Sequence, residues 1–141
     1  MSERHTSVPG NAAQLPALTQ FLHDFWSCAG LPQAEAIKFE LALEEVFMNV
    51  VTHGSAADRT PRVDVSLAIV DGELTLTVED DGPLFDPLSL APPDTTASLG
   101  ERRVGGLGVF LMRQMMDSVR YQRLGARNQL QMTKRLGGGR Y

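Results

Sequence analysis

Two runs of alternating apolar residues, one on each side of Asp71-Gly72, constrain the fold of this chain more than any other feature. The apolar positions are Val63, Val65, Leu67 and Ile69 before the pair, and Leu74, Leu76 and Val78 after it. Strict alternation places these side chains on one face of each strand, and Asp-Gly between two such runs is a strong hairpin signal. The pattern predicts an antiparallel hairpin whose apolar face must be covered by a second layer.

Helical segments that could form this second layer precede the hairpin. Apolar residues recur at helical spacing from Leu15 to Cys28, and Gly30-Leu31-Pro32 is a typical helix stop. A second helix is expected from about Gln33 to Val51. Its expected apolar stripe consists of Ile37, Leu41, Leu43, Val46, Phe47 and Val50.

The pattern continues after the hairpin with one more helix and two more strands. A helix is expected from about Val109 to Asp117, opened by Gly105-Gly106-Leu107-Gly108, and a closing hairpin from Val119 to Leu124 and Gln129 to Leu136. Residues 1 to 12 are expected to be a mobile or edge-strand lead-in. Hairpin-linked strands with helices packed on one face predict the α+β class, as a two-layer sandwich. The length of 141 residues predicts a single domain, 1–141.

Composition excludes several classes of function. The net charge of −4 gives no support to direct nucleic-acid binding, and Cys28, the only cysteine, permits neither an internal disulfide nor a cysteine-based metal site. The apolar runs are far shorter than a membrane span, and the polar N-terminus lacks the apolar centre of a signal peptide. A cytoplasmic protein without a membrane partner is expected.

Glu45 and Asn49 form the first candidate site. They are four residues apart in the second helix and therefore share a face. Carboxylate and amide oxygens suit a magnesium ion that also holds phosphates. Solvated side chains on a helix face are the alternative interpretation, and the very apolar surroundings of the pair weigh against it because buried polar groups need partners or a ligand.

The end of the predicted hairpin forms the second candidate site. Asp80 could accept a hydrogen bond from an exocyclic amine such as that of adenine, and Gly82 would let the backbone pass close beneath a flat base. An ordinary polar turn is the alternative.

Gly106 and Gly108 are the third candidate. Backbone amides at the start of a helix bind phosphate, and glycines allow close approach, although flexible loops also use glycine pairs. The sequence matches neither a Walker loop nor a dinucleotide fingerprint. Residues 82 to 105 precede these glycines and contain four prolines, at positions 83, 87, 92 and 93, without any core periodicity. A loop of this length in a small domain is usually functional or disordered.

In this order, Glu45-x-x-x-Asn49, Asp80-x-Gly82 and Gly106-x-Gly108 resemble the nucleotide-binding boxes of the GHKL superfamily of ATPases, which includes histidine kinases and gyrase. The resemblance covers about residues 14 to 136. It is closer to the anti-sigma-factor serine kinases of bacteria, whose pattern is similar to three segments here. These are Leu41-Ala42-Leu43-Glu44-Glu45 through His53-Gly54, Asp80 to Pro87, and Gly105 to Tyr121.

The resemblance implies the Bergerat fold and a role for each residue. Asn49 would ligate Mg²⁺ between the phosphates of ATP, and Glu45 would be the catalytic base near the γ-phosphate. Asp80 would hold the adenine amine and Gly82 would line the base pocket. Gly106 and Gly108 would shape the phosphate loop, with residues 84–105 as a lid over ATP.

The resemblance also implies partners. Family members bind a sigma factor, phosphorylate a serine of a small STAS-domain antagonist, and are often homodimers. The lid of this chain, with Pro92-Pro93 and Glu101-Arg102-Arg103, differs from that of the best-known members. Many proteins of this branch act in other partner-switching circuits, so the target need not be a sigma factor. An ATP-gated protein-binding regulator without significant kinase activity is the alternative function. His53 is expected to be a helix-end or structural residue.

Overall fold

The computed structural model describes residues 2–54, 59–89 and 106–136. Its elements are β1 (Ser2–Pro9), η1 (Ala12–Gln14), α1 (Leu15–Ala29), α2 (Gln33–Gly54), β2 (Arg62–Val70), β3 (Glu73–Asp80), η2 (Pro87–Ser89), α3 (Gly106–Met115), β4 (Ser118–Leu124) and β5 (Arg127–Arg135). Within these residues, no helix combines the length and the apolar character needed to cross a membrane.

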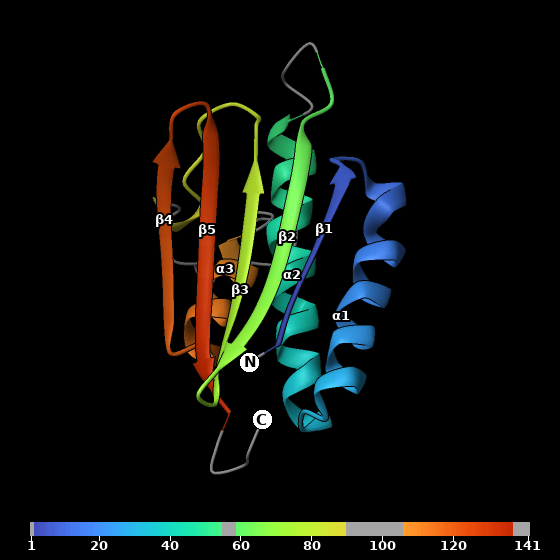
Figure 1. Ribbon diagram of the computed structural model, residues 1–141. Coiled ribbons are helices and arrows are strands. Elements are labelled where there is room, and N and C mark those ends of the chain that lie inside the picture. Colours follow the sequence, from blue (N-terminus) through green and yellow to red (C-terminus); the bar gives the residue numbers. More distant parts are fainter. Residues whose placement is uncertain (1, 55–58, 90–105, 137–141) are drawn as a thin grey trace.

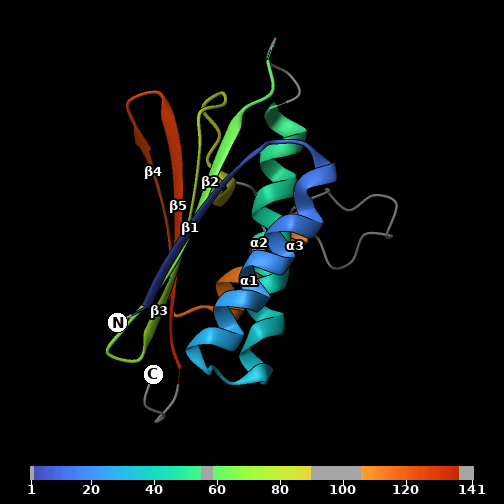
Figure 2. The ribbon, with the colours of Figure 1, turned by 45° about the vertical axis from the view of Figure 1, so that its right-hand side comes forward.

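The described strands form one antiparallel sheet in the order β1-β2-β3-β5-β4. The three helices lie on one face of this sheet, as Figures 1 and 2 show, and the opposite face has no helix against it in the described part of the chain. The predicted α+β two-layer sandwich is therefore confirmed. The lead-in at residues 1 to 12 contains the edge strand β1, one of the two expectations for it.

The alternating residues of the first hairpin form the sheet side of the core. Val65, Leu67, Leu74 and Leu76 are fully buried, and the neighbours between them are only partly buried. The turn at Asp71-Gly72 places both residues at positive φ, 52° and 79°, which explains why this pair occurs there. The helix side of the core includes Trp26, which packs 5.4 Å from the ring of Phe39.

The predicted apolar stripe of α2 is wrong at its N-terminal end. Ile37 and Leu41 are 53% and 48% exposed, whereas Ala36, Phe39 and Ala42 are buried. The helix contacts α1, α3 and β3, and Ala36, Phe39 and Ala42 form its buried face, which leaves Ile37 and Leu41 outside the core. The periodicity identified the helix but not which of its apolar residues face the core.

Two further boundaries differ from expectation. Helix α3 begins at Gly106, so Gly106 and Gly108 belong to its first turn and do not precede the helix. Strand β5 begins at Arg127, two residues before the expected start, because its pairing with β3 continues to Asn128 opposite Asp80. This longer pairing places Asn128 in the buried end of the sheet.

Pro61 brings three chain segments together near that end. The Gly10 amide donates to the Pro61 carbonyl oxygen at 2.7 Å, and Gly54, the last residue of α2, lies directly against the Pro61 ring. A Cβ atom on Gly54 would come within 2.6 Å of the Pro61 Cγ atom, and one on Gly82 within 3.4 Å of the Pro61 Cβ atom. Glycine at these positions lets the end of α2 approach the end of β3.

Candidate functional site

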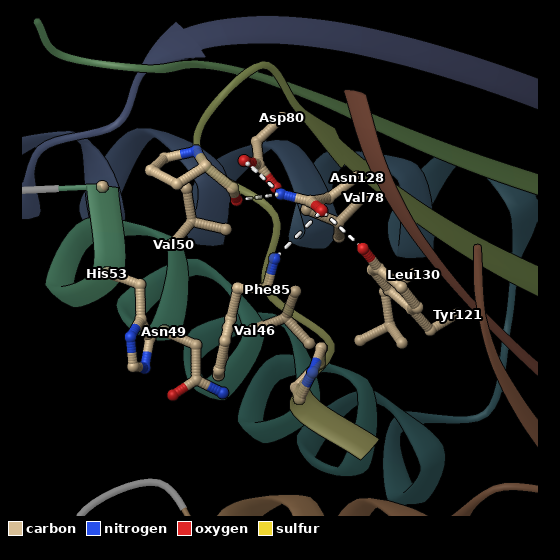
Figure 3. Close-up of a pocket in the computed structure, with 13 residues that line it drawn as sticks. Val46, Asn49, Val50, His53, Val78, Asp80, Phe85, Tyr121, Asn128 and Leu130 are labelled. Carbon is tan, nitrogen blue, oxygen red and sulfur yellow. Dashed lines mark hydrogen bonds between the residues drawn. The ribbon is translucent and has the colours of Figure 1, made fainter. Parts of the chain in front are cut away.

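A cavity lies between the C-terminal half of α2 and the ends of β3, β4 and β5 (Figure 3). Its walls come from segments that are far apart in the sequence. The lining residues are Val46, Asn49, Val50, His53, Gly54, Val78, Asp80, Pro83, Phe85, Pro87, Tyr121, Asn128 and Leu130. A mainly apolar cleft with a few convergent polar groups is the typical form of a small-molecule site.

Asp80 is the acidic residue of this cavity and is 7% exposed. Its Oδ2 atom accepts hydrogen bonds from the Gly82 amide at 2.9 Å and from Asn128 Nδ2 at 3.1 Å. Burial raises the pKa of Asp80, and the hydrogen bonds from Asn128 and Gly82 and the charge of Arg123 only partly oppose this increase. The hydrogen-bonded carboxylate is therefore poised to accept a further hydrogen bond from a ligand.

Gly82 is buried beside Asp80. A Cβ atom at this position would lie 2.9 Å from Asp80 Oδ2, closer than real Cβ contacts allow. The absence of a side chain thus lets the backbone amide reach the carboxylate. This geometry accounts for the glycine two residues after Asp80.

Asn49 lies on the opposite wall of the same cavity, on α2, and is 9% exposed. Its Nδ2 atom is buried without a hydrogen-bond partner among the described residues. A buried amide nitrogen without a protein partner at a cavity wall is available to donate to a ligand or to water. The structure thus brings Asn49, Asp80 and Gly82 together, although they come from two segments of the sequence.

Glu45 lies one helical turn before Asn49 but lines a second hollow, between α2 and α3, with Leu41, Glu44, Met48, Leu111 and Met115. Burial raises the pKa of Glu45; the nearby Asn49 amide lowers it and the charge of Glu44 raises it further. The amide is close enough to affect this pKa, yet Glu45 Oε1 has no partner with full hydrogen-bond geometry in the described part of the chain. Glu45 thus adjoins the Asn49 cavity without lining it.

The remaining candidates lie at α3 and in the loop before it. Gly106 and Gly108 form the first turn of α3, whose amides have no partner within the helix. Most of the predicted lid, residues 90–105 with Arg102 and Arg103, lies outside the described residues. Its first part is described, and there Phe85 and Pro87 line the cavity. The lid boundaries and the single-domain assignment stay predictions.

Several lining residues were not singled out by sequence reasoning. Asn128 contacts Asp80 directly, Tyr121 contacts Asn128, and His53 stacks on Phe85 with ring centroids 3.7 Å apart. His53 is at the helix end, as expected, but its ring also forms part of the cavity wall. One signal for Asn128 existed: it shares the alternation of the buried Leu130 and Met132, where a polar residue is unusual.

No cluster of three or more histidine, cysteine, aspartate or glutamate side chains that could hold a metal ion occurs in the described ranges.

Comparison with known proteins identifies the family. Residues 8–134 match the model of the histidine kinase-like ATPase domain. The chain belongs to this family. The resemblance inferred from the sequence is thereby confirmed.

Curated relatives of this histidine kinase-like ATPase chain are named as serine kinases. The chain is 30% identical to the serine/threonine-protein kinase BtrW of Bordetella bronchiseptica over 114 residues, which cover 79% of this chain and 75% of that protein. It is 28% identical to the serine-protein kinase RsbW of Bacillus subtilis over 137 residues, covering 94% and 85% of the two chains. The predicted closeness to the serine-kinase branch is thereby confirmed.

Solved structures show the same fold. The RsbU and RsbW domains of Rv1364c from Mycobacterium tuberculosis match with a TM-score of 0.70 at 17% identity, over 96% of this chain and 33% of that one. A blue-light activated histidine kinase of Erythrobacter litoralis matches with a TM-score of 0.53 at 20% identity, over 75% and 32%. These likenesses support the predicted Bergerat-type architecture.

Proposed function

We propose that this chain is a Mg-ATP-dependent serine protein kinase and anti-sigma factor that phosphorylates an anti-sigma-factor antagonist. One observation carries the proposal: Asn49 and the buried Asp80 face the same cavity from two different layers of the fold. One offers an amide oxygen for a metal ion and the other a carboxylate for a base amine. The names of the kinase relatives support the choice of reaction.

The protein would bind ATP through residues of three elements. Asp80 on β3 would accept a hydrogen bond from the adenine amine, and Gly82 would keep the backbone close to the base. Asn49 on α2 would ligate Mg²⁺ through its amide oxygen. Gly106 and Gly108 would bring the amides of the first turn of α3 to the phosphates. Bound Mg²⁺ would offset the negative charge of the phosphate oxygens.

Glu45 would act on the incoming serine. Its raised pKa makes the carboxylate a better proton acceptor than an ordinary surface glutamate, and Oε1 has no partner among the described residues that would compete for this role. Phosphoryl transfer depends mainly on positioning and charge stabilisation, which a rigid helix provides. Glu45 and Asn49 lie on consecutive turns of α2, so one helix would position both the base and the metal ligand.

The partners proposed for this chain are a STAS-domain antagonist carrying the acceptor serine, a sigma factor, and a second copy of the chain as a homodimer. We place the protein in the cytoplasm because ATP and sigma factors are found there. Neither nucleic acid nor membrane is proposed as a direct partner, since the net charge is −4.

The nucleotide site is tested with Asn49→Ala, measured by calorimetry with Mg-ATP. We expect binding to be lost or nearly lost, because the amide is the proposed metal ligand. Glu44→Gln is the matched control on the same helix, since Glu44 is exposed and has no proposed role in binding. Unchanged affinity of the Asn49→Ala protein would refute the site.

The kinase function is tested by pull-down from the native cell extract with the purified chain, once with Mg-ATP and once with Mg-ADP, followed by mass spectrometry. A bound sigma factor, together with a small antagonist that gains phosphoserine only with ATP, is the expected result. A nucleotide-dependent partner without phosphorylation would overturn the kinase proposal and leave an ATP-gated binding protein. Without any nucleotide-dependent partner, the anti-sigma role would be rejected.

A further inference from the structure

Asn128 has all of its amide hydrogen-bonding capacity engaged at the cavity wall (Figure 3). Its Nδ2 atom donates to Asp80 Oδ2 at 3.1 Å and to the Pro83 carbonyl oxygen at 2.8 Å. Its Oδ1 atom accepts from the Tyr121 hydroxyl at 2.6 Å, from Arg123 Nη1 at 3.1 Å and from the Phe85 amide at 3.3 Å. The side chain is 6% exposed, so water cannot replace these partners.

These contacts allow only one orientation of the amide. A flipped Asn128 would place Oδ1 against two acceptors, Asp80 Oδ2 and the Pro83 carbonyl, and would turn its NH₂ group toward the donors of Arg123 and Phe85. Arg123 connects Asn128 to the segment after Asp80, because its Nη1 atom donates both to Asn128 Oδ1 and, at 3.1 Å, to the Gly82 carbonyl oxygen. Asn128 therefore presents an N–H donor to Asp80 at all times.

The fixed donor leaves Asp80 with one oxygen for a ligand. Both hydrogen bonds that Asp80 accepts within the described residues converge on Oδ2, from Gly82 and from Asn128. One oxygen suffices for adenine, which presents a single exocyclic amine, N6. A carboxylate that binds guanine well accepts two hydrogen bonds at once. One oxygen accepts from N1–H and the other from the neighbouring N2 amine, as in other bidentate pairs.

We propose that Asn128 is the positioning residue that makes this site select adenine over guanine, by occupying the second oxygen of Asp80. The proposal rests on the proposed nucleotide-binding function and deepens it by naming what sets base selectivity. Asn128 acts through Asp80 and through the Gly82–Phe85 segment. Without it, the Gly82 amide alone holds Asp80 Oδ2 at 2.9 Å. That oxygen then has spare capacity to accept a second donor from the ligand, which favours guanine relative to adenine.

The test compares Asn128→Leu with the wild-type chain by calorimetry, using non-hydrolysable analogues of ATP and GTP as Mg complexes. Leucine has the same branching and the same number of side-chain heavy atoms as asparagine, and its side chain can neither donate nor accept a hydrogen bond. We expect the wild-type chain to prefer the ATP analogue, and the ratio of the two affinities to fall about tenfold in the variant. Gln131→Ser is the matched control, because Gln131 lies on the opposite face of β5 and contacts Thr77.

The ratio separates a positioning role from a structural one. If Asn128 only held the loop in place, Asn128→Leu would weaken both analogues equally and the ratio would stay at the wild-type value, which would overturn the proposal. Equal affinity of the wild-type chain for both analogues would also overturn it. Failure of the wild-type chain to bind either analogue would instead refute the proposed function.

A second variant keeps the test decisive if Asn128→Leu does not fold. Tyr121→Phe retains Asn128 and removes only the 2.6 Å hydrogen bond to its Oδ1 atom. The amide is then held less firmly, so the affinity ratio should fall in the same direction by a smaller factor. If Asn128→Leu cannot be measured and Tyr121→Phe keeps the wild-type ratio of ATP-analogue to GTP-analogue affinity, the proposal is contradicted.

Discussion

At the scale of single residues, the buried Asp80 and the partly buried Glu45 are two carboxylates with raised pKa values that differ in their partners. Asp80 accepts hydrogen bonds from Gly82 and Asn128, whereas Glu45 Oε1 has no hydrogen-bond partner among the described residues. A satisfied carboxylate is suited to hold a ligand in one orientation. A carboxylate with a raised pKa and a free oxygen is suited to take a proton, because burial destabilises its charge more than the Asn49 amide stabilises it.

Glu45→Gln should preserve nucleotide binding and abolish phosphotransfer. The amide keeps the size of the side chain but cannot accept a proton, and general-base catalysis contributes roughly 10²–10⁴-fold to a rate. Transfer of labelled phosphate to the antagonist protein, measured beside Mg-ATP affinity, checks this. Glu40→Gln is the matched control, because Glu40 lies on the same helix, contacts His23 at 3.3 Å and is not among the groups that shift the pKa of Glu45. Transfer at the wild-type rate in Glu45→Gln would show that Glu45 is not the base.

Asp80 should make nucleotide affinity depend on pH. The ionised carboxylate accepts the adenine amine more strongly than the protonated form does, so affinity should decrease as the pH falls through the pKa of Asp80. Because burial raises this pKa, the decrease should begin at a higher pH than the ordinary value of about 3.9 implies. Calorimetry on the wild type and Asp80→Asn with the same Mg-nucleotide cancels the titration of the nucleotide itself. Parallel pH curves for the two proteins would contradict this expectation.

At the scale of elements, the contact between the end of α2 and Pro61 sets the shape of the cavity. Gly54 closes α2 and lines the cavity, and Pro61 immediately precedes β2. Helix and sheet approach closely only because Gly54 has no side chain at this contact.

Gly54→Ala should therefore destabilise the protein by about 1–3 kcal/mol, the usual cost of overpacking. The sign of this change in the free energy of unfolding is informative. Replacing glycine by alanine at a helical position without a clash would stabilise the protein by up to about 1 kcal/mol. Urea denaturation gives the free energy of unfolding. In a Pro61→Ala background the clash with Cγ is absent, so the same change should cost less. Equal costs in both backgrounds would mean that the contact with Pro61 is not responsible.

At the scale of the whole molecule, the two faces of the sheet differ in kind. One face is covered by helices and is apolar; the other is polar and has no helix against it in the described residues (Figure 2). On the polar face Arg127 of β5 forms ion pairs with Glu79 of β3, at 3.2 Å, and with Asp64 of β2. These pairs connect three strands through side chains alone.

The pair with Asp64 should contribute stability that depends on pH. Burial acts to raise the pKa of Asp64, but hydrogen bonds from Ser7 and Arg127 and the charges of Arg127 and His5 outweigh burial and lower it. The folded-state pKa is thus below the ordinary value of about 3.9. The stabilisation is fully present above that value and is lost as the pH falls through the folded-state pKa.

Arg127→Gln should lower the free energy of unfolding at pH 7 by less than about 1 kcal/mol, because the pair is partly exposed. The difference from wild type should shrink as the pH falls well below the ordinary value for aspartate. Urea denaturation at neutral and acidic pH checks this. Arg120→Gln is the control, since Arg120 is exposed on the same sheet and forms no ion pair among the described residues. A pH-independent difference would reject the role of Asp64.

Much of the fold can be predicted from near neighbours in the chain. The alternation around Asp71-Gly72, the helix stop at Gly30, whose φ is 66°, and the spacing of Glu45 and Asn49 depend only on residues within a few positions of each other. Local backbone geometry is sufficient to interpret such patterns. The family resemblance added the order of the three motifs, and that order led to the correct family.

The rest was decided by contacts between distant segments. Asn128 lies beside Asp80 because β5 pairs with β3 in one particular register, and a shift by one residue would turn Asn128 to the opposite face. The exposure of Ile37 and Leu41 follows from the packing of α2 against α1 and the sheet. The alternation places Asn128 on the buried face of its strand. Local periodicity could not predict that Asp80 is its partner or that Ile37 and Leu41 are exposed, because register and packing depend on the simultaneous fit of all elements in the core.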